Sequence, residues 1–544
     1  MMTDFENNFF DRKAVLDLLR RRVLDLKEGY RQNVALLGDR FIGKSSILSK
    51  FMSDLDDDGV VTIYLDLDYK NYDYLFAKFT GSLLNGFCRA QKLPLHTDTA
   101  LLIEESKKLI PKTAEHIKKI QNLLSRAKLT EAYRELMALP ETFTLESGKF
   151  CIIILDEFHR LGDLRIPNAF QELGKKIMTQ RRCLYIVTSS YGTVAKTILS
   201  EKLSLLFGNF EIVSVGPFDL KTSQEFIAYN LKDVRIGDSL RNFLIDFTGG
   251  HPFYLNIICQ ELSDLSAIHK QGEAFLPLLT QAVERTIFDK WGSLSRHFEL
   301  ILNSICQNKG GRLMPLLMIA LANGKHKIDE IAREAGLVKN ITTQKINRLI
   351  EAGIVAKNGN LYYMPDKLFK YWVKYVFQKS FKSIDSRPQQ RKSEFQQEFS
   401  GLVNDFYGIS RKDLSSRIVE LLNCFDDELF SINGKKYKLS SFQEVVSLGL
   451  SDRGGRDLDL LKASSTQGVW FIALKEGILS EADVNAFMDQ SKKLRQKPQR
   501  RVIISLNDLD VNTRLKALQE KMWIWNEEEL NTLLNLYDKP YILK

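Results

Sequence analysis

The stretch Gly38-Asp39-Arg40-Phe41-Ile42-Gly43-Lys44-Ser45 reads G-x-x-x-x-G-K-S, which is the spacing of a phosphate-binding P-loop. The apolar residues 34–37 before it predict a buried strand, and residues 46–51 after it predict the first turns of a helix. Glycines let backbone N–H groups turn toward a phosphate, and the start of a helix adds its dipole and free N–H groups. The motif and its context therefore predict a nucleotide-binding loop.

The same motif assigns roles to the side chains that would meet a nucleotide. Lys44 is expected to reach the β- and γ-phosphates and to take part in catalysis, and Ser45 is expected to bind Mg²⁺. A glycine turn that matches the pattern by chance is the alternative, and the flanking strand and helix argue against it. Nucleotide contacts are expected along the whole loop and into the helix: Gly38, Asp39, Arg40, Phe41, Ile42, Gly43, Lys44, Ser45 and Ser46.

Composition narrows the class of protein. The 544 residues suffice for three or four domains, and 44% hydrophobic with 27% charged residues is ordinary for a globular protein. A net charge of +9 permits a nucleic-acid partner without requiring one. The six cysteines form no C-x-x-C pair, which predicts neither a zinc site nor a disulfide framework. With no signal-like N-terminus and no apolar run of membrane-spanning length, we expect a cytoplasmic protein that does not enter a membrane.

A second motif completes the chemistry that the P-loop begins. Residues 151–155 form an uninterrupted apolar run, which predicts a central strand buried on both faces, and the run ends in Asp156-Glu157. Asp156 would hold Mg²⁺ through its water shell, and Glu157 would orient and deprotonate the attacking water. An apolar strand that ends in two carboxylates is a weak signal alone but a strong one downstream of a P-loop.

Three more apolar runs predict the remaining strands of a sheet, at residues 60–65, 183–187 and 210–215. The run 183–187 leads into Thr188-Ser189-Ser190, where related ATPases place a polar sensor residue beside the γ-phosphate. Asp66 and Asp68 follow the run 60–65, and either a role near Mg²⁺ or a solvated turn would explain them.

Segments outside the sheet leave alternatives open. The amphipathic residues 9–28 predict a helix whose start either lies over an adenine or only covers the sheet edge. Residues 93–146 predict a helical insertion of unknown role. At residues 248–252, two glycines and a proline predict that one helix ends and another begins, so His251 is a helix corner or a nucleotide contact.

Taken together, the P-loop, the Asp-Glu strand, the Thr-Ser-Ser strand, Gly216-Pro217-Phe218 and Thr248-Gly249-Gly250-His251-Pro252 resemble the archaeal-type P-loop ATPases. That family is a prokaryotic branch of the STAND and AAA+ assemblage, and the resemblance covers roughly residues 5–380. It implies an α/β fold with a parallel sheet of order 5-1-4-3-2 and a helical lid. It also implies that His251 and Pro252 contact the base or ribose. A lid arginine of the AAA+ sensor-2 type is not evident in the sequence.

A third signal lies downstream of the lid. Helical patterns at residues 313–322, 328–337 and 342–352, the last begun by a Thr342 cap, precede a hairpin with an Asn358-Gly359 turn. Three helices and a hairpin predict a winged helix, which binds duplex DNA or docks a protein, and the sequence leaves both open. The third helix would present Thr343, Gln344, Lys345, Asn347 and Arg348.

After a predicted linker at residues 383–392, the last domain resembles a PD-(D/E)xK nuclease fold, which some archaeal-type ATPases carry at the C-terminus. In that motif Asp459 and an acidic residue two positions before Lys475 would bind Mg²⁺, and Lys475 would stabilise hydroxide. The acidic position is Ala473 here, so we expect a degenerate binding or interaction domain. Glu420 and Glu476 remain candidate substitutes for the lost carboxylate.

The sequence thus predicts four domains: an ATPase core at residues 1–215, a lid at 216–292, a winged helix at 293–382 and a nuclease-like domain at 393–544. We expect an ATP-binding and ATP-hydrolysing molecular switch that uses ATP and Mg²⁺. Its partner would be double-stranded DNA, another protein or further copies of itself. The alternatives are a DNA-processing nuclease regulated by its ATPase and a nucleotide-binding scaffold without turnover.

Overall fold

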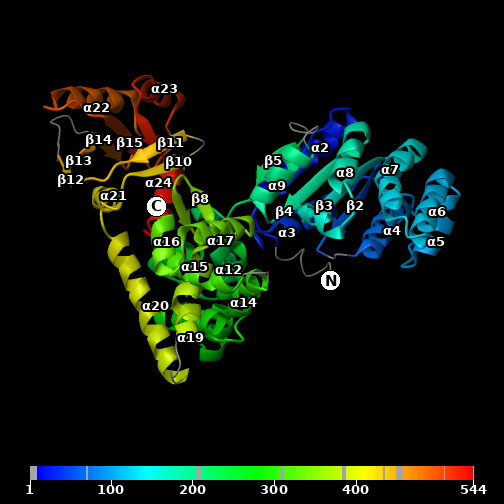
Figure 1. The fold of residues 1–544 in the computed structure, drawn as a ribbon, viewed down its shortest axis with the longest axis horizontal. Coiled ribbons are helices and arrows are strands. Elements are labelled where there is room, and N and C mark those ends of the chain that lie inside the picture. The colour runs from blue at the N-terminus through cyan, green and yellow to red at the C-terminus, as the bar shows by residue number, and fades with distance from the viewer. Residues whose placement is uncertain are drawn as a thin grey trace. The chain divides into compact units, whose positions relative to one another are not determined.

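The computed structural model describes residues 9–68, 71–203, 210–307, 311–382, 388–432, 435–448, 458–507 and 509–542. Contacts between residues divide the chain into two compact units. The first unit is Met1–Phe218 together with His251–Phe253, and the second is Asp219–Gly250 together with Tyr254–Lys544. Figure 1 shows the elements of each unit by label. The finer division into four domains stays a prediction.

A parallel five-stranded sheet forms the centre of the first unit (Figure 1). Its strands lie in the order β5-β1-β4-β3-β2, the order that the resemblance implies. The side chains of β1 and β4 are fully buried, because helices cover both faces of these inner strands. The strands are β1 (Asn33–Leu37), β2 (Val60–Asp66), β3 (Phe150–Asp156), β4 (Cys183–Ser189) and β5 (Phe210–Ser214).

Two hydrophobic cores hold helices against the two faces of this sheet. On one face, α2 (Lys13–Lys27) and α3 (Lys44–Asp54) pack Leu19 and Phe51 against Leu36 and Ile154. On the other face, α4 (Tyr72–Ala90), α8 (Ala169–Thr179) and α9 (Gly192–Thr197) pack on the opposite side chains of the same strands. This second core also includes the predicted insertion, which is helical: α5 (Thr99–Lys107), α6 (Pro111–Ser125) and α7 (Leu129–Ser147).

The second unit begins with helices. Gly249 and Gly250, at φ +62° and +70°, end α11, and Pro252 begins α12, so the expected helix corner is present. The helices are α10 (Leu220–Asn230), α11 (Asp238–Thr248), α12 (Pro252–His269), α13 (Leu276–Val283) and α14 (Ser293–Cys306), with a short parallel pair formed by β6 (Arg235–Ile236) and β7 (Glu273–Ala274).

Three helices and a hairpin follow, as the sequence predicted, but two details differ. Thr342 is not a cap, because α17 begins one turn earlier and the Thr342 hydroxyl donates to the carbonyl of Val338, as a threonine inside a helix can. The hairpin turn is Gly359-Asn360, since Asn358 pairs with Leu361. The elements are α15 (Met314–Ala322), α16 (Ile328–Glu334), α17 (Lys339–Glu351), β8 (Ala356–Asn358) and β9 (Leu361–Tyr363).

The segment 383–392, which the sequence predicts as a linker, is helical in its second half. Residues 383–387 lie outside the described residues, and residues 388–392 form the first turn of the long helix α20 (Pro388–Ser410). A proline is compatible with the first position of a helix, where its missing N–H has no partner to lose, so Pro388 starts this helix instead of breaking it. The helices before it are α18 (Lys367–Trp372) and α19 (Gln378–Lys382).

A mixed sheet of order β12-β13-β14-β15-β16 forms the C-terminal part, with β14, β15 and β16 parallel and the others antiparallel. The strands are β12 (Glu444–Ser447), β13 (Asp459–Ser465), β14 (Gly468–Lys475), β15 (Arg500–Ser505) and β16 (Trp523–Trp525), beside a hairpin of β10 (Glu428–Ile432) and β11 (Lys435–Leu439). The helices are α21 (Leu414–Leu422), α22 (Glu481–Lys493), α23 (Val511–Gln519) and α24 (Glu527–Leu536).

The structure does not bring Asp459 and Lys475 together. Asp459 pairs with Leu474, whose side chain packs in the core under α21 and α24, and the exposed Asp459 carboxylate accepts a hydrogen bond from Ser415 of α21. Lys475 lies on the other face, beside α22, where Ala473 is fully buried. In the part of the chain that the structure describes, no group of three or more His, Cys, Asp or Glu side chains could hold a metal ion.

Lys475 has a structural partner instead. Its ammonium donates to the Asp483 carboxylate at 2.8 Å, and the same carboxylate caps α22 by accepting from the N–H and hydroxyl of Ser480. Burial raises the pKa of Asp483, but the hydrogen bonds from Lys475 and Ser480 outweigh it, so the pKa lies below its ordinary value. A carboxylate of this kind stabilises the fold above its unfolded-state pKa, and the contribution disappears as pH falls through its lowered pKa.

We therefore expect Lys475→Met to lower the free energy of unfolding by about 1–3 kcal/mol at neutral pH, because Asp483 stays buried with one partner fewer. The difference should shrink as the pH falls through the lowered pKa of Asp483, because the carboxyl group is then protonated in both proteins. A series of urea unfolding curves from neutral to acidic pH measures it. Lys492→Met is the matched control, since the Lys492–Asp489 ion pair is exposed and should change stability by less than about 0.5 kcal/mol. Loss of a Mg²⁺-dependent DNA cleavage in Lys475→Met, with unchanged stability, would contradict this assignment.

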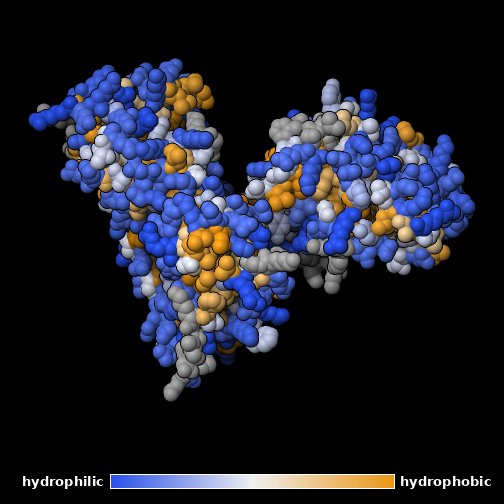
Figure 2. Space-filling view, viewed as in Figure 1, coloured by the Kyte–Doolittle hydropathy of each residue, from blue (hydrophilic) through white to orange (hydrophobic). Residues whose placement is uncertain are grey.

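The visible face of each unit is largely hydrophilic, with scattered hydrophobic patches (Figure 2). Among the described residues, no helix combines the length and the apolar character needed to cross a membrane.

Candidate functional site

The predicted P-loop connects the carboxyl end of β1 to the first turn of α3. Gly43, at φ +103°, is the residue before the helix and adopts a conformation that favours glycine. A Cβ at Gly38 would lie 2.2 Å from the carbonyl oxygen of Val215, so no other residue fits there without a shift of the backbone. The loop is therefore shaped by two glycines for different reasons, one conformational and one steric.

Lys44 is the first residue of α3, and its side chain is buried. The ammonium donates to the carbonyl oxygens of Gly38 at 2.8 Å and Asp39 at 2.9 Å, and to the Ser190 hydroxyl at 2.9 Å. The Glu157 carboxylate lies 3.9 Å away. Burial lowers the pKa of Lys44, while the neighbouring carboxylates oppose that shift. The backbone carbonyls of the P-loop therefore fold back over this ammonium.

Asp156 ends β3 and is held by three hydroxyl groups. One of its oxygens, Oδ2, accepts from Ser45 at 2.9 Å and from Tyr64 at 2.7 Å, and Oδ1 accepts from Thr188. Burial raises the pKa of Tyr64, and the Asp156 charge raises it further, so the phenol stays protonated and remains a donor. The carboxylate is thus oriented from β2, β4 and α3 at once.

Glu157 follows directly and has a left-handed backbone, with φ +53°. Its N–H donates to the Thr188 hydroxyl at 3.0 Å, and its carboxylate accepts from the N–H of Ser190 at 2.9 Å and from the Ser190 hydroxyl. The Nδ1 atom of His159 lies 3.3 Å from the same carboxylate and 2.9 Å from the Ser189 hydroxyl. Burial lowers the pKa of His159, although Glu157 opposes that shift.

Two segments that the sequence left ambiguous lie on the P-loop. Arg12 donates to the carbonyl oxygens of Gly216 at 2.5 Å and Ile42 at 3.4 Å. His251 places Nε2 3.2 Å from the carbonyl oxygen of Arg40. These contacts bring the N-terminal segment and the corner at His251–Phe253 to the loop, and the ring of Phe253 stacks on Phe41 at 4.8 Å between centroids. Whether His251 and Pro252 contact a nucleotide stays a prediction.

The carboxylates at the end of β2 lie beside the site, because Asp66 is the register partner of Asp156 in the neighbouring strand. Asp68 pairs with Arg160 at 2.7 Å and lies 3.8 Å from Arg40, while Asp66 accepts from the N–H of Asp68 at 2.9 Å. These contacts are compatible with a turn stabilised by ion pairs, and a role of Asp66 or Asp68 near Mg²⁺ stays a prediction.

The residues present fit Mg²⁺ and a nucleotide phosphate. The oxygens of Ser45 and Asp156 approach within 2.9 Å, and a hard cation binds one or two such protein oxygens together with phosphate oxygens and water. Gly38 leaves the space that a Cβ would fill, and the N-terminus of α3 offers free N–H groups to an anion.

Two members of the site had no role in the sequence interpretation. Tyr64 lies on β2 and reaches Asp156 across the sheet, and His159 lies in the short helix η1 (Phe158–Leu164) just after Glu157. The alternation of Thr62 and Tyr64 with apolar residues in β2 was the available signal for Tyr64. Its partner depends on the parallel register of β2 with β3, which the sequence alone does not specify.

No protein-family model matches this sequence, and no curated protein matches it either. Among solved structures, the chain resembles a Walker-type ATPase of Pyrococcus abyssi, with 18% identity, 68% of this chain and 96% of that chain covered, and a TM-score of 0.47. It also resembles the ORC2 protein of Aeropyrum pernix, with 10% identity and a TM-score of 0.43; the match covers 70% of this chain and 98% of that chain.

A third similar structure is the RuvB Holliday junction branch migration motor of Thermotoga maritima, with 14% identity and a TM-score of 0.35; the match covers 67% of this chain and 96% of that chain. At these identities and TM-scores the likenesses do not decide what this chain does, and its function rests on the geometry of the site.

Proposed function

We propose that this protein binds ATP with Mg²⁺ at the P-loop of its first unit, hydrolyses it to ADP and phosphate, and acts as a nucleotide-dependent switch. The observation that carries the proposal is the position of Glu157. Its carboxylate is fixed by two hydrogen bonds from Ser190 and lies 3.9 Å from Lys44, beside the Ser45–Asp156 pair. A base, a cation and a metal-ligand pair in one place are the parts that phosphoryl transfer to water requires.

Each residue of the site has a role that its contacts support. The backbone N–H groups of the loop, which the sequence assigns to residues 38–46, would cradle the phosphates, and Lys44 would place its charge against the β- and γ-phosphate oxygens. Ser45 and Asp156 would hold Mg²⁺, which neutralises charge on those oxygens. Tyr64 and Thr188 keep the Asp156 carboxylate in one orientation.

Glu157 would orient the attacking water and take its proton. Its hydrogen bonds come from Ser190, and its backbone N–H is tied to Thr188, so the carboxylate is positioned by the strand that the sequence identified as the sensor strand. A base held in this way loses little entropy when it meets the water.

The switch would work through Ser190, whose hydroxyl contacts both Lys44 and Glu157. When Lys44 turns toward a γ-phosphate, Ser190 loses one of its two partners, and the end of β4 senses the change. Switch segments of this kind are ordered while they contact the γ-phosphate, and they lose that order when hydrolysis removes it.

We also propose that helices α15, α16 and α17 with the β8–β9 hairpin form a winged helix that contacts duplex DNA. Of the side chains expected at its recognition helix, Gln344, Asn347 and Arg348 are exposed, and all three can reach base edges or phosphates. Lys345 is buried and is a poor candidate, which corrects the sequence-based expectation.

Phosphate release from ATP with Mg²⁺, with and without duplex DNA, tests this function. We expect turnover by the full chain and none by Lys44→Ala, which removes the ammonium that would meet the phosphates. Turnover that rises with DNA supports the winged helix as a DNA module, and turnover indifferent to DNA points to a protein partner. Tight nucleotide binding with no phosphate release by the unaltered chain would contradict the enzyme and leave a scaffold.

A further inference from the structure

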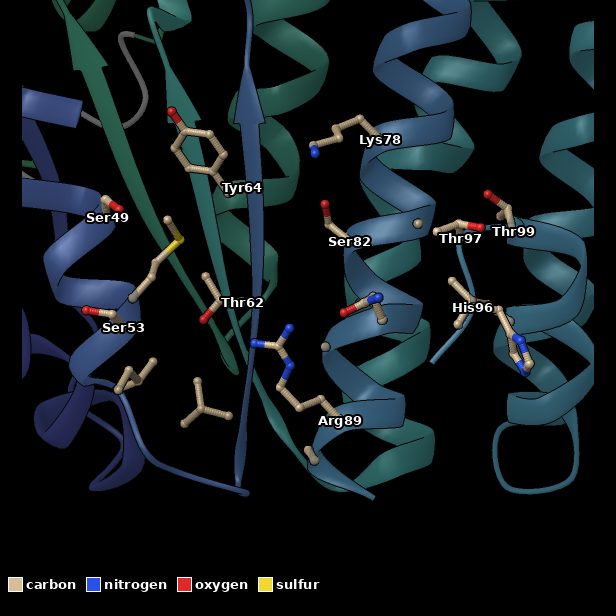
Figure 3. Close-up of a pocket in the computed structure, with 18 of the residues that line it drawn as sticks. Ser49, Ser53, Thr62, Tyr64, Lys78, Ser82, Arg89, His96, Thr97 and Thr99 are labelled. Atoms are coloured by element: carbon tan, nitrogen blue, oxygen red, sulfur yellow. The ribbon is translucent and has the colours of Figure 1, made fainter. Parts of the chain in front are cut away.

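A groove of about 1230 Å³ lies in the first unit, next to the candidate site (Figure 3). Its floor is the face of β2 that carries Thr62 and Tyr64, one wall is α3, and the other is α4. Small-molecule sites enclose about 300–1,000 Å³, so the size favours a segment of a macromolecule. Most of the lining side chains are small or hydroxyl-bearing, among them Ser49, Ser53, Gly81, Ser82, Thr97 and Thr99.

The groove exists because one face of the edge strand β2 lacks the helical layer that the inner strands have. The equivalent face of β1 and β3, with Leu36 and Ile154, is fully buried in the core under α2 and α3. Thr62 and Tyr64 on β2 are only half-buried. Strands of a parallel sheet are normally covered by helices on both faces. An additional helix over Thr62 and Tyr64 would therefore complete the covering of β2.

A partner strand does not fit here, whereas a helix does. At Gly86, α4 packs so tightly on β2 that a Cβ would lie 2.9 Å from a methyl group of Val61 and 3.6 Å from the Thr62 carbonyl oxygen. The free side of β2 is therefore occupied, and a further strand cannot pair along it. The residues of α3 and α4 that line the groove include Ser49, Ser53, Gly81 and Ser82, whose small side chains let the backbone of a helix approach closely.

Charge defines the occupant further. Lys78 and Arg89 of α4 are exposed, and Figure 3 shows both side chains reaching toward β2. Three turns of helix separate them, a rise of about 16 Å. No ion pair to either is found among the described residues. Carboxylates at a similar spacing on one face of a helix would complement both.

Nucleic acid is disfavoured by carboxylates at the end of the groove where β2 begins. Asp56, Asp57 and Asp58 line the groove there, and among the described residues only Asp57 forms an ion pair, with Lys27. A polyanionic backbone would be repelled by these carboxylates along its length, whereas a helix can place a basic side chain beside them and single acidic side chains opposite Lys78 and Arg89.

We propose that this groove binds an amphipathic α-helix of a partner protein, whose acidic side chains pair with Lys78 and Arg89. The bound helix would cover Tyr64, whose hydroxyl donates to the same oxygen of Asp156 that accepts from Ser45. Occupancy of the groove would thus act on the magnesium ligand. This regulatory part rests on the proposed function, and the binding part does not.

The binding part is tested with a display library of helical peptides of about 16 residues, selected on the full-length protein. Selected peptides should carry Asp or Glu about three turns apart, and Lys78→Glu and Arg89→Glu should each weaken their binding at least about tenfold by fluorescence anisotropy. Lys108→Glu, an exposed lysine outside the groove, is the matched control and should bind unchanged. Circular dichroism checks that each variant is folded.

Two outcomes overturn the binding part: no peptide is enriched, or enriched peptides bind the Lys78→Glu and Arg89→Glu proteins as tightly as the unaltered chain. A single-stranded oligonucleotide probe that binds and is lost in the same two variants would overturn it in favour of nucleic acid.

The regulatory part is tested with Tyr64→Phe at saturating peptide, as the ratio of phosphate release with and without the peptide. This ratio should become one in the variant, whatever its basal turnover, because the hydroxyl that links the groove to Asp156 is missing. If the unaltered chain releases no phosphate, the proposed ATPase function is wrong, but the regulatory part is still testable. The effect of the peptide is then measured on the Mg²⁺-dependence of fluorescent ADP binding instead of on turnover. A peptide that has no effect on the unaltered chain, or an equal effect on Tyr64→Phe, would overturn the regulatory part.

Discussion

Replacing Glu157 with glutamine is expected to lower ATP turnover about 10²–10⁴-fold, because the amide cannot accept the proton of the attacking water. Glutamine has the same shape, and its carbonyl oxygen can still accept from the N–H of Ser190. Nucleotide binding should therefore be retained, since Lys44, Ser45 and the loop are unchanged. Single-turnover phosphate release and binding of a fluorescent ATP analogue separate the two quantities.

Glu141→Gln serves as the control for that substitution, because Glu141 is a half-buried glutamate of α7 in the same unit whose side chain is 40% exposed and lies 3.9 Å from Lys176. Its turnover should equal that of the unaltered chain. If Glu157→Gln released phosphate at the same rate as the control, Glu157 would not be the base, and the proposal would lose the observation on which it rests.

The second large effect is expected from Gly38→Ala. The added methyl group would lie 2.2 Å from the carbonyl oxygen of Val215, so either the P-loop or the segment after β5 must move. We expect nucleotide affinity to fall at least about tenfold and the free energy of unfolding to fall by about 1–3 kcal/mol, as overpacking usually costs. Titration with a fluorescent nucleotide and urea unfolding measure the two effects.

Gly216→Ala is the matched control for Gly38→Ala. Gly216 lies in the same region, but nothing is within 4 Å of the position that a Cβ would take there. Its stability should change by less than about 0.5 kcal/mol. Equal effects of the two substitutions would show that close packing at Gly38 does not shape the loop.

The parts of the fold that the sequence predicted are those in which local pattern and burial agree. An inner strand of a parallel sheet is buried on both faces, so it reads as a continuous apolar run, and residues 34–37, 151–155 and 183–187 are strands as expected. The loop between β1 and α3 follows from its glycines and its helix start. These features need only neighbouring residues to be recognised.

The parts that escaped prediction depend on pairing between distant segments. The contact of Lys44 with Ser190 and that of Tyr64 with Asp156 follow from the order and register of strands that are far apart in the chain. The PD-(D/E)xK motif would place Asp459 and Lys475 in one site, but here they lie on opposite faces of two paired strands. Successive side chains of a strand point to opposite faces of the sheet. Lys475 follows Leu474, the pairing partner of Asp459, so the Lys475 side chain points to the face opposite Asp459.

The chain crosses between the two units three times, because His251–Phe253 belongs with the first unit although it follows Gly250 of the second. A gene fragment that stops at Phe218 would therefore encode a truncated core. It would lack the imidazole that faces the Arg40 carbonyl oxygen and the ring that stacks on Phe41, leaving that phenylalanine uncovered at the tip of the P-loop. Recombinant work on this candidate site consequently requires an expression product that extends beyond Phe253.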